Sequence, residues 1–333
     1  MKPLFLYIKN YNNMSNLTLT IEDMIKPSTF KQPKVIHKMR KPFDNTPTIN
    51  PKVIDFLQKA TDTMPEDLPE YDGKTIPRII HFCYINYKNI PAGHDVLFLA
   101  WMEHLKDYTF INWTPEKLHS NPFIKFALEN KRWAFFADYV RVYAVGKYGG
   151  FYMDCDVMVY KSFNDLLTLP YVFDAERRYV DGRAPEKLIE CGSFGAQPGN
   201  PLIMAIEKYY ASLNSGFKLG PDFVAPRLWN NVAKRNHIDI NQDFSKKLKG
   251  IPTNSSGDYY NDTLNIDVYK DTVTGNPDVI YLLDSTYLSK PNCDMYTRYC
   301  VQHPHDASGV FPWAYTSHQF YTEWSLSKPS KDA

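Results

Sequence analysis

Strand and helix patterns alternate from Arg78 to Tyr160, and this alternation restricts the possible folds of the chain more than any other feature. Apolar, β-branched and aromatic residues predict three strands, at Arg78–Tyr84, Tyr108–Trp113 and Phe151–Tyr160. Helical patterns predict three helices between them, at 94–106, 122–130 and 132–147. Strands that alternate with helices across short loops favour an α/β fold with a mainly parallel sheet. Ligands of such sheets bind at the carboxyl ends of the strands.

The rest of the chain is less regular. Residues 1–75 are rich in Pro, Asn and Lys, and we expect an N-terminal extension that is partly helical, with a helix start at Asn50-Pro51. A linker at 65–75 then leads into a domain at 76–325, which is followed by a tail at 326–333. The later predicted elements of that domain are helices at 201–213 and 222–235, loops or a lid at 236–276, and a strand at 278–283.

The charge of the chain argues against nucleic-acid binding. The 333 residues include 38 Lys and Arg and 37 Asp and Glu, which gives a formal net charge of +1. A duplex binder normally presents a basic stripe, because neutralisation of phosphates drives its affinity. The densest basic run, between Lys31 and Lys41, is interpreted as a solvated segment. Peripheral contact with anionic lipid, or with a phosphate-bearing acceptor, is the alternative.

The sequence favours a cytoplasmic protein. No stretch reaches the roughly 18 apolar residues that span a bilayer, and the apolar start at Pro3–Ile8 is too short for a secretory signal. The five cysteines are odd in number and lack CxxC spacing, so we expect neither a disulfide framework nor a zinc knuckle. A peripheral position at the inner face of the membrane is the alternative location. No feature of the sequence predicts an oligomeric state.

Two aspartates interrupt the third predicted strand. Asp154 and Asp156 flank Cys155 in an otherwise apolar segment. Buried carboxylates are costly unless they are paired, protonated or bound to metal. Strand alternation would place both side chains on one face if the strand stayed regular. Two oxygen ligands this close suit a hard cation such as Mg²⁺ or Mn²⁺, and a simple surface turn is the alternative.

The helix before this strand carries a second charged pair. Asp138 and Arg141 are i, i+3 neighbours and share one face of the predicted helix. The small residues Ala134 and Ala137 would let a ligand or a strand come close. The alternative is an ion pair on the helix surface, which contributes little to stability. We favour a functional role because the helix leads through Gly149-Gly150 directly into the strand with the two aspartates.

Together these segments resemble a known family. Ile76–His81, Trp133–Arg141 and Tyr148–Asp156 are similar to segments of the DXD-containing sugar transferases of glycosyltransferase family 32, and distantly to the clostridial glucosylating toxins. The resemblance covers about residues 76–325. Weaker matches lie at 192–201, 220–221 and 315–324. The resemblance implies a GT-A fold, a nucleotide-sugar donor, a divalent metal ion and retention of anomeric configuration.

The resemblance also implies roles for individual residues. Asp156 is expected to bind the metal directly, and Asp154 to contact the ribose and the metal shell. Asp138 and Arg141 are expected to hold hydroxyls of the donor sugar. Tyr84 and Trp133 are expected to contact the nucleotide, and Tyr152 to lie beside the donor. His318 and Trp324 are expected to close over the diphosphate, with His318 as an additional metal ligand.

Three positions depart from the family pattern. Tyr84 stands where members usually carry the Trp on which the nucleobase stacks, and a smaller ring still allows stacking. Cys191 replaces an Asn expected near the anomeric carbon, which leaves open whether the neighbouring Glu190 takes over. Glu190 is also the candidate nucleophile for a covalent intermediate, the alternative to direct attack by the acceptor. Glu323 replaces a Ser and would be either a metal ligand or a repulsive neighbour of the phosphates.

The expected function is transfer of a hexose-type sugar from a nucleotide sugar, by resemblance a UDP-sugar, to a hydroxyl of a glycan or lipid-linked glycan, as in surface polysaccharide synthesis. The alternatives are a protein-glycosylating effector with the same chemistry, a non-catalytic module that binds a sugar nucleotide, and a phosphatase of the haloacid-dehalogenase type. The phosphatase family also uses Asp-x-Asp after an apolar strand. Its later acidic motif is imitated by Gly257–Asp262, but that segment follows polar residues rather than a strand.

Overall fold

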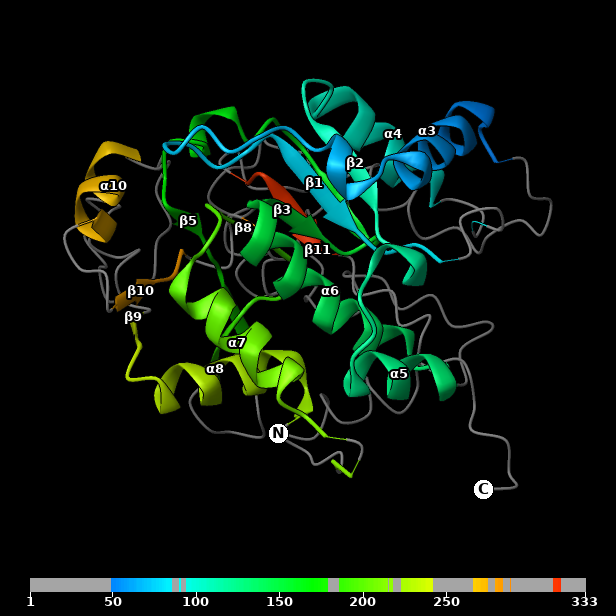
Figure 1. Cartoon of the computed structure of the whole chain (residues 1–333). Coiled ribbons are helices and arrows are strands. Elements are labelled where there is room, and N and C mark those ends of the chain that lie inside the picture. The colour runs from blue at the N-terminus through cyan, green and yellow to red at the C-terminus, as the bar shows by residue number, and fades with distance from the viewer. Residues whose placement is uncertain are drawn as a thin grey trace, which may run out of the picture. The chain divides into compact units, whose positions relative to one another are not determined.

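Figure 1 shows the computed structural model of the chain. The structure describes residues 49–85, 90, 94–178, 186–214, 216–217, 223–241, 266–274, 279–283, 288 and 314–318. Contacts divide the chain into two compact units, residues 1–42 with 305–309 and residues 43–304 with 310–333, and all described residues belong to the second. The basic run Lys31–Lys41, the segment Gly257–Asp262, Glu323 and Trp324 lie outside the described residues.

A five-stranded sheet forms the centre of the second unit, in the order β2-β1-β3-β8-β5. Its strands are β1 (Ile79–Phe82), β2 (Thr109–Asn112), β3 (Gly150–Met153), β5 (Tyr171–Val172) and β8 (Ser193–Ala196). β1 pairs in parallel with β2 and β3, whereas β8 pairs antiparallel with both β3 and β5. Four strands therefore run in one direction. This topology confirms the expected α/β fold with a mainly parallel sheet and is consistent with GT-A.

The predicted helices are confirmed, with ends displaced by a few residues. They are α4 (Asp95–His104), α5 (Pro122–Glu129), α6 (Trp133–Tyr148), α7 (Pro201–Ala211) and α8 (Ala225–Arg235). Within the described ranges, short 3-10 turns lie at Pro65–Asp67, Pro115–Lys117 and Asn164–Leu166. α5 and α7 pack on α6, and α8 packs on α7 (Figure 1). No helix in the described ranges is long and apolar enough to cross a membrane.

Helices cover both faces of the sheet. Successive residues of a strand face opposite sides. Phe82 of β1 packs edge-on against Trp101 of α4, with ring centroids 5.5 Å apart, whereas His81 lies against Tyr148 at the end of α6, at 6.5 Å. α4 and α6 therefore cover opposite faces of β1. All four residues of β1 are buried, as expected for a parallel strand covered on both sides.

The helix predicted at Asn50-Pro51 is α3 (Pro51–Asp62). Its N-cap is Asn50, whose side chain accepts a hydrogen bond from the Lys52 N–H at 3.0 Å. The helix packs on β2, where Phe56 meets Phe110 edge-on at 4.8 Å. Part of the residues expected to form an extension thus contributes to the core around the central sheet. The domain boundary at residue 76 stays a prediction.

Gly149-Gly150 joins α6 to β3, as predicted. Gly149 ends the helix with φ 67°, and Gly150 begins the strand with φ 99°. A Cβ at residue 150 would lie 2.6 Å from the carbonyl oxygen of Ile79, so only glycine lets β1 and β3 pair this closely here.

His81 lies beside this turn and is fully buried. The indole N–H of Trp113 donates to His81 Nδ1 at 3.0 Å, so the ring proton sits on Nε2, which lies 2.7 Å from the carbonyl oxygen of Gly149 and donates to it. Both ring nitrogens are therefore used by a neutral imidazole. Burial lowers the pKa of His81 to about 4, although the hydrogen bond to Gly149 acts in the opposite direction.

The prediction of one strand over Phe151–Tyr160 is wrong. β3 ends at Met153, and a separate strand β4 (Val157–Val159) pairs antiparallel with β11 (Thr316–His318). Between β3 and β4 the Val157 N–H donates to the Asp154 carbonyl at 3.0 Å, and this hydrogen bond closes a tight turn. Asp154 and Asp156 are therefore related by a turn and not by the alternation of a regular strand.

The expected loop or lid at 236–276 contains two described elements. β9 (Asp239–Asn241) pairs in parallel with β10 (Val279–Tyr281), with Ile240 opposite Ile280, and α10 (Ile266–Thr274) precedes β10. β10 confirms the strand predicted at 278–283. The antiparallel hairpin of β6 (Ala175–Arg178) and β7 (Glu186–Ile189) was not predicted, and neither were β5 and β8.

Candidate functional site

The candidate site lies at the edge of the sheet where the parallel strands end. Cys83, Trp113 and Asp154 directly follow β1, β2 and β3 at this edge. β8 runs in the opposite direction and begins here, with Ser193 paired to Met153. The residues that precede β8 therefore lie beside Asp154. This is the edge at which α/β sheets bind their ligands.

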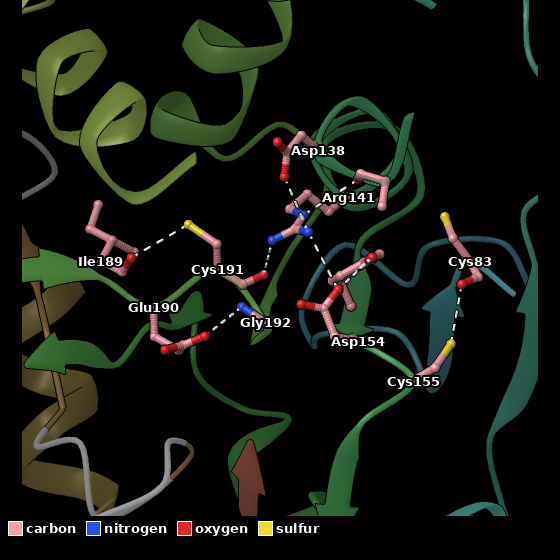
Figure 2. Close-up of polar contacts among 11 residues, drawn as sticks. Cys83, Asp138, Arg141, Asp154, Cys155, Ile189, Glu190, Cys191 and Gly192 are labelled. Carbon is pink, nitrogen blue, oxygen red and sulfur yellow. Dashed lines mark hydrogen bonds and ion pairs between the residues drawn. The ribbon is translucent and has the colours of Figure 1, made fainter. Parts of the chain in front are cut away.

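Arg141 of α6 connects three separate segments at this edge (Figure 2). Its Nη2 lies 3.2 Å from Asp138 Oδ1 and 3.3 Å from Asp154 Oδ1, and its Nη1 donates to the Cys191 carbonyl at 2.7 Å. The guanidinium carbon also lies 4.9 Å from the centre of the Tyr152 ring. Asp138 and Arg141 are only 7% and 6% exposed, so the predicted pair is buried and is not a surface ion pair.

Asp154 is fixed by both its side chain and its main chain. Its Oδ1 accepts a hydrogen bond from the Tyr152 hydroxyl at 2.9 Å, in addition to the ion pair with Arg141. Its main-chain N–H donates to the Gly192 carbonyl at 2.7 Å. The side chain keeps 25% exposure, so the carboxylate links the buried cluster to the open edge of the sheet.

The electrostatics of this cluster keep the Arg141 guanidinium positively charged between the carboxyl groups of Asp138 and Asp154. Burial raises the pKa of Asp138 to about 6; Arg141 opposes this shift and Asp154 adds to it. Burial disfavours the charge of Arg141, but Asp154, Tyr152 and Asp138 together hold the pKa of its guanidinium above the usual value. Burial raises the pKa of Tyr152, so its phenol stays protonated and can donate to Asp154.

Glu190, Cys191 and Gly192 form the loop that holds the cluster from the side of β8. The Gly192 N–H donates to Glu190 Oε1 at 2.7 Å, and Glu190 is 3% exposed. The carbonyl of Cys191 accepts from Arg141, and the carbonyl of Gly192 accepts from Asp154. This loop thus positions Arg141 and Asp154 through its main chain, while the Glu190 carboxylate supports the loop (Figure 2).

Tyr84 lies at the same edge, after the end of β1. Its half-buried ring meets Phe98 of α4 edge-on at 5.8 Å. Its main chain is held by the Asn112 side chain: the Tyr84 N–H donates to Oδ1 at 2.7 Å, and Nδ2 donates to the Tyr84 carbonyl at 3.0 Å. Trp133, the first residue of α6, is 44% exposed, so the start of that helix presents an indole ring to solvent.

Among the described residues, no three or more His, Cys, Asp or Glu side chains are grouped so as to hold a metal ion. The donors still fit Mg²⁺ or Mn²⁺, because Mg²⁺ is usually held by one or two carboxylates together with substrate phosphates and water. Asp156 is half-buried in the turn. Val157, the residue after Asp156, is paired through its main chain with His318 of β11. The strand register thus brings His318 beside the turn that carries Asp154 and Asp156.

Two residues of this edge were missed by sequence reasoning. Asn112 is the last residue of β2, and a polar residue at the end of an apolar strand was a usable signal. Cys155 lies between the two aspartates, and its thiol donates to the Cys83 carbonyl at 3.1 Å, which ties the turn to the end of β1. No local pattern predicts that contact, because it depends on the pairing of β1 with β3.

The match to one family model supports sugar transfer in general terms. Residues 91–172 match the family model described as a glycosyltransferase sugar-binding region containing a DXD motif, and Asp138, Arg141, Asp154 and Asp156 lie inside the match. A search of curated proteins found no match to this chain. Among solved structures, the chain is similar to one titled "PaToxG Glycosyltransferase", with 15% identity and a TM-score of 0.38 over 49% of this chain and 70% of that chain. The assignment to glycosyltransferase family 32 stays a prediction.

Proposed function

We propose that the chain is a metal-dependent, retaining glycosyltransferase that moves a hexose-type sugar from a UDP-sugar to a hydroxyl of a glycan or lipid-linked glycan. The observation that carries the proposal is the buried cluster of Asp138, Arg141 and Asp154 at the carboxyl edge of the sheet. These residues lie within the segment that matches the DXD sugar-binding region. A buried ion-pair network that opens onto a ligand-binding edge is typical of a functional site.

The chemistry of the substrate matches the charges at this edge. Cleavage of a sugar–phosphate bond builds positive charge on the sugar and negative charge on the leaving diphosphate. A divalent cation supplies neutralisation of that diphosphate when it is bound. In this proposal Asp156 and His318 hold the cation, and Asp138 and Arg141 orient hydroxyls of the donor sugar. Asp154 is held before substrate binds, and this preorganisation lowers the cost of reaching the reactive geometry.

The proposed route to retention is attack by the acceptor hydroxyl from the face that the diphosphate leaves, with the departing phosphate as the base. The alternative is a covalent intermediate on Glu190. Glu190 Oε1 accepts the Gly192 N–H at 2.7 Å, and a hydrogen bond to a carboxylate stabilises it and makes it a weaker nucleophile. This contact supports direct attack and a positioning role for Glu190.

The proposed location is the cytoplasm, peripheral to the inner face of the membrane if the acceptor is lipid-linked. The five cysteines are odd in number and lack CxxC spacing, which suits a reducing compartment. Surface polysaccharide synthesis is the proposed process, because it consumes cytoplasmic nucleotide sugars and hydroxyl acceptors.

The proposal is tested with a panel of sugar nucleotides and Mn²⁺, by following release of nucleoside diphosphate with and without glycan acceptors. We expect release from a UDP-hexose that stops when EDTA is added. Asp156→Ala should lower the rate at least about 100-fold, because the cation loses its direct ligand. Asp107→Ala, at an exposed aspartate away from the site, is the matched control. Turnover by Asp156→Ala at the wild-type rate, with the metal still required, contradicts the assignment.

A further inference from the structure

Asn112 continues the pairing of β1 and β2 after the two strands separate. The parallel ladder ends with Phe82 opposite Asn112, and the Trp113 N–H donates to the Phe82 carbonyl at 2.8 Å. Beyond this point the Asn112 carboxamide replaces a peptide unit. It accepts from the Tyr84 N–H at 2.7 Å and donates to the Tyr84 carbonyl at 3.0 Å. The side chain therefore holds Tyr84 as a further strand would.

The orientation of this carboxamide is fixed by its partners. Nδ2 also donates to Thr61 Oγ1 at 2.9 Å, and the Thr61 hydroxyl donates its own proton to the Leu57 carbonyl at 2.7 Å. A flipped amide would place its NH₂ group against the Tyr84 N–H and its oxygen against two oxygens, so only one orientation satisfies every group. Asn112 is fully buried, which makes each of these hydrogen bonds costly to lose.

Helix α3 is joined to the same point. Lys117 Nζ donates to the Asn112 carbonyl and to the Thr63 carbonyl at the end of α3, each at 2.7 Å. Burial lowers the pKa of Lys117 to about 8, which fits an amine enclosed between these carbonyls. Thr61 and Lys117 thus fix the two ends of Asn112, its side chain and its main chain, to α3.

We propose that Asn112 is a positioning residue for Tyr84, the residue on which the nucleobase of the donor would stack. Asn112 holds the main chain of Tyr84 and is itself held by Thr61. Through these contacts it sets the affinity of the protein for the base of the donor nucleotide. This inference rests on the proposed function, in which Tyr84 meets the nucleobase. Asn112 acts through Tyr84 and is not itself a catalytic residue. Its effect belongs to binding of the base and not to the diphosphate or the transfer step.

The test compares binding of UDP and of inorganic pyrophosphate, both with Mn²⁺, by titration calorimetry. Asn112→Ala should weaken UDP about tenfold and leave pyrophosphate within twofold, because pyrophosphate has no base. Thr61→Val, which keeps the shape of the side chain, should weaken UDP two- to threefold. Asn236→Ala is the matched control, since the Asn236 amide donates to the Val232 carbonyl at 2.8 Å at the end of α8, a helix that packs on α7 and not on β1 or β2.

A double variant separates positioning from general stability. If Asn112 acts through Tyr84, Asn112→Ala combined with Tyr84→Ala should bind UDP no more weakly than Tyr84→Ala alone. In kinetics, Asn112→Ala should raise KM for the donor and keep kcat within about twofold. Equal losses for UDP and pyrophosphate, or additive losses in the double variant, would overturn the inference.

Ligand-free measurements distinguish this inference from the proposed function. Hydrogen exchange of the Tyr84 amide should accelerate at least tenfold in Asn112→Ala relative to the Ile80 amide in the centre of the ladder. Unchanged exchange overturns the inference even where the variant is stable. A wild-type protein that binds no nucleotide overturns the proposed function and the nucleobase assignment together. Wild-type UDP binding that Asn112→Ala and Thr61→Val leave intact overturns the positioning role alone.

Discussion

His81 and Arg141 are both buried polar side chains next to the central sheet, but their surroundings differ in charge. The His81 ring lies between an indole donor and a carbonyl acceptor, and all three groups are neutral. The Arg141 guanidinium lies between two carboxylates and a carbonyl, at the edge where the parallel strands end. The first cluster is closed by its own partners, whereas the second keeps a carboxylate that is 25% exposed.

This difference separates a structural polar cluster from the cluster that we propose to be functional. Neutral groups that satisfy each other fully inside a core make the fold specific and leave nothing for a ligand to complete. A charged cluster that reaches the surface retains capacity for a further cation or hydroxyl, and it costs more to build because the charges are desolvated. Burial alone therefore does not support the assignment of a site; burial together with an open carboxylate at the carboxyl edge of the sheet is what supports the proposal.

The largest expected effect is that of Arg141→Met. It leaves Asp138 and Asp154 facing each other without a cation, and loss of one partner from a buried ion pair typically costs about 3–5 kcal/mol. Activity should fall at least about 100-fold. Urea unfolding and nucleoside diphosphate release measure the two effects. Lys125→Met is the control, because Lys125 pairs with Glu129 at 3.8 Å on an exposed helix face, where a pair contributes less than about 0.5 kcal/mol.

The next effect is that of His81→Leu, which should destabilise the protein and leave the activity of the folded fraction unchanged. It leaves the Trp113 indole N–H and the Gly149 carbonyl unpaired, which together cost about 2–4 kcal/mol. Combining His81→Leu with Trp113→Phe should cost less than the sum of the single variants, because the two side chains share one hydrogen bond. A reduced kcat in folded His81→Leu would break the contrast between the clusters.

The smallest effect is the pH dependence of stability, which should have opposite signs for the two clusters. The pKa of His81 falls from 6.5 to about 4, so its contribution is complete above pH 6.5 and is lost, by up to about 3 kcal/mol, as the pH falls through 4. The pKa of Asp138 rises from 3.8 to about 6, so its contribution is complete below pH 3.8 and is lost as the pH rises through 6.

Urea midpoints measured between pH 4 and pH 7 test both signs. His81→Leu should remove the loss at the acid end, and Asp138→Asn should remove the loss on the neutral side. Parallel profiles for wild type and Asp138→Asn would show that Asp138 does not titrate in this range in the folded protein.

The local sequence pattern was sufficient to predict the helices and the Asp138–Arg141 pair. Residues three positions apart on a helix share a face whatever the helix packs against, and the stop at Gly149-Gly150 follows from backbone conformations that other residues avoid. These features depend on sequence neighbours, so they could be read directly.

The turn at Asp154 could not be predicted in the same way. Residues from Phe151 to Tyr160 have strand propensity, but the Asp154 N–H bonds to the Gly192 carbonyl and the chain turns there. β8 was also missed, because it includes Gly195, whose Cβ would lie 2.4 Å from the Phe151 ring. That glycine reflects a close approach between two strands, which only the folded sheet reveals.

The position of β11 has a consequence for protein synthesis. Its Thr316–His318 segment pairs with β4, directly after the turn that carries the two aspartates, and the Tyr160 and Ser317 hydroxyls share a hydrogen bond at 2.7 Å. A ribosome adds these residues after every other described part of the chain. A nascent chain that has already completed the central sheet and α6 therefore still lacks the partner of β4. The turn gains this flanking strand only after the segments of the central sheet and α6 have been made, so the surroundings of Asp154 and Asp156 are the last of the described parts to be completed.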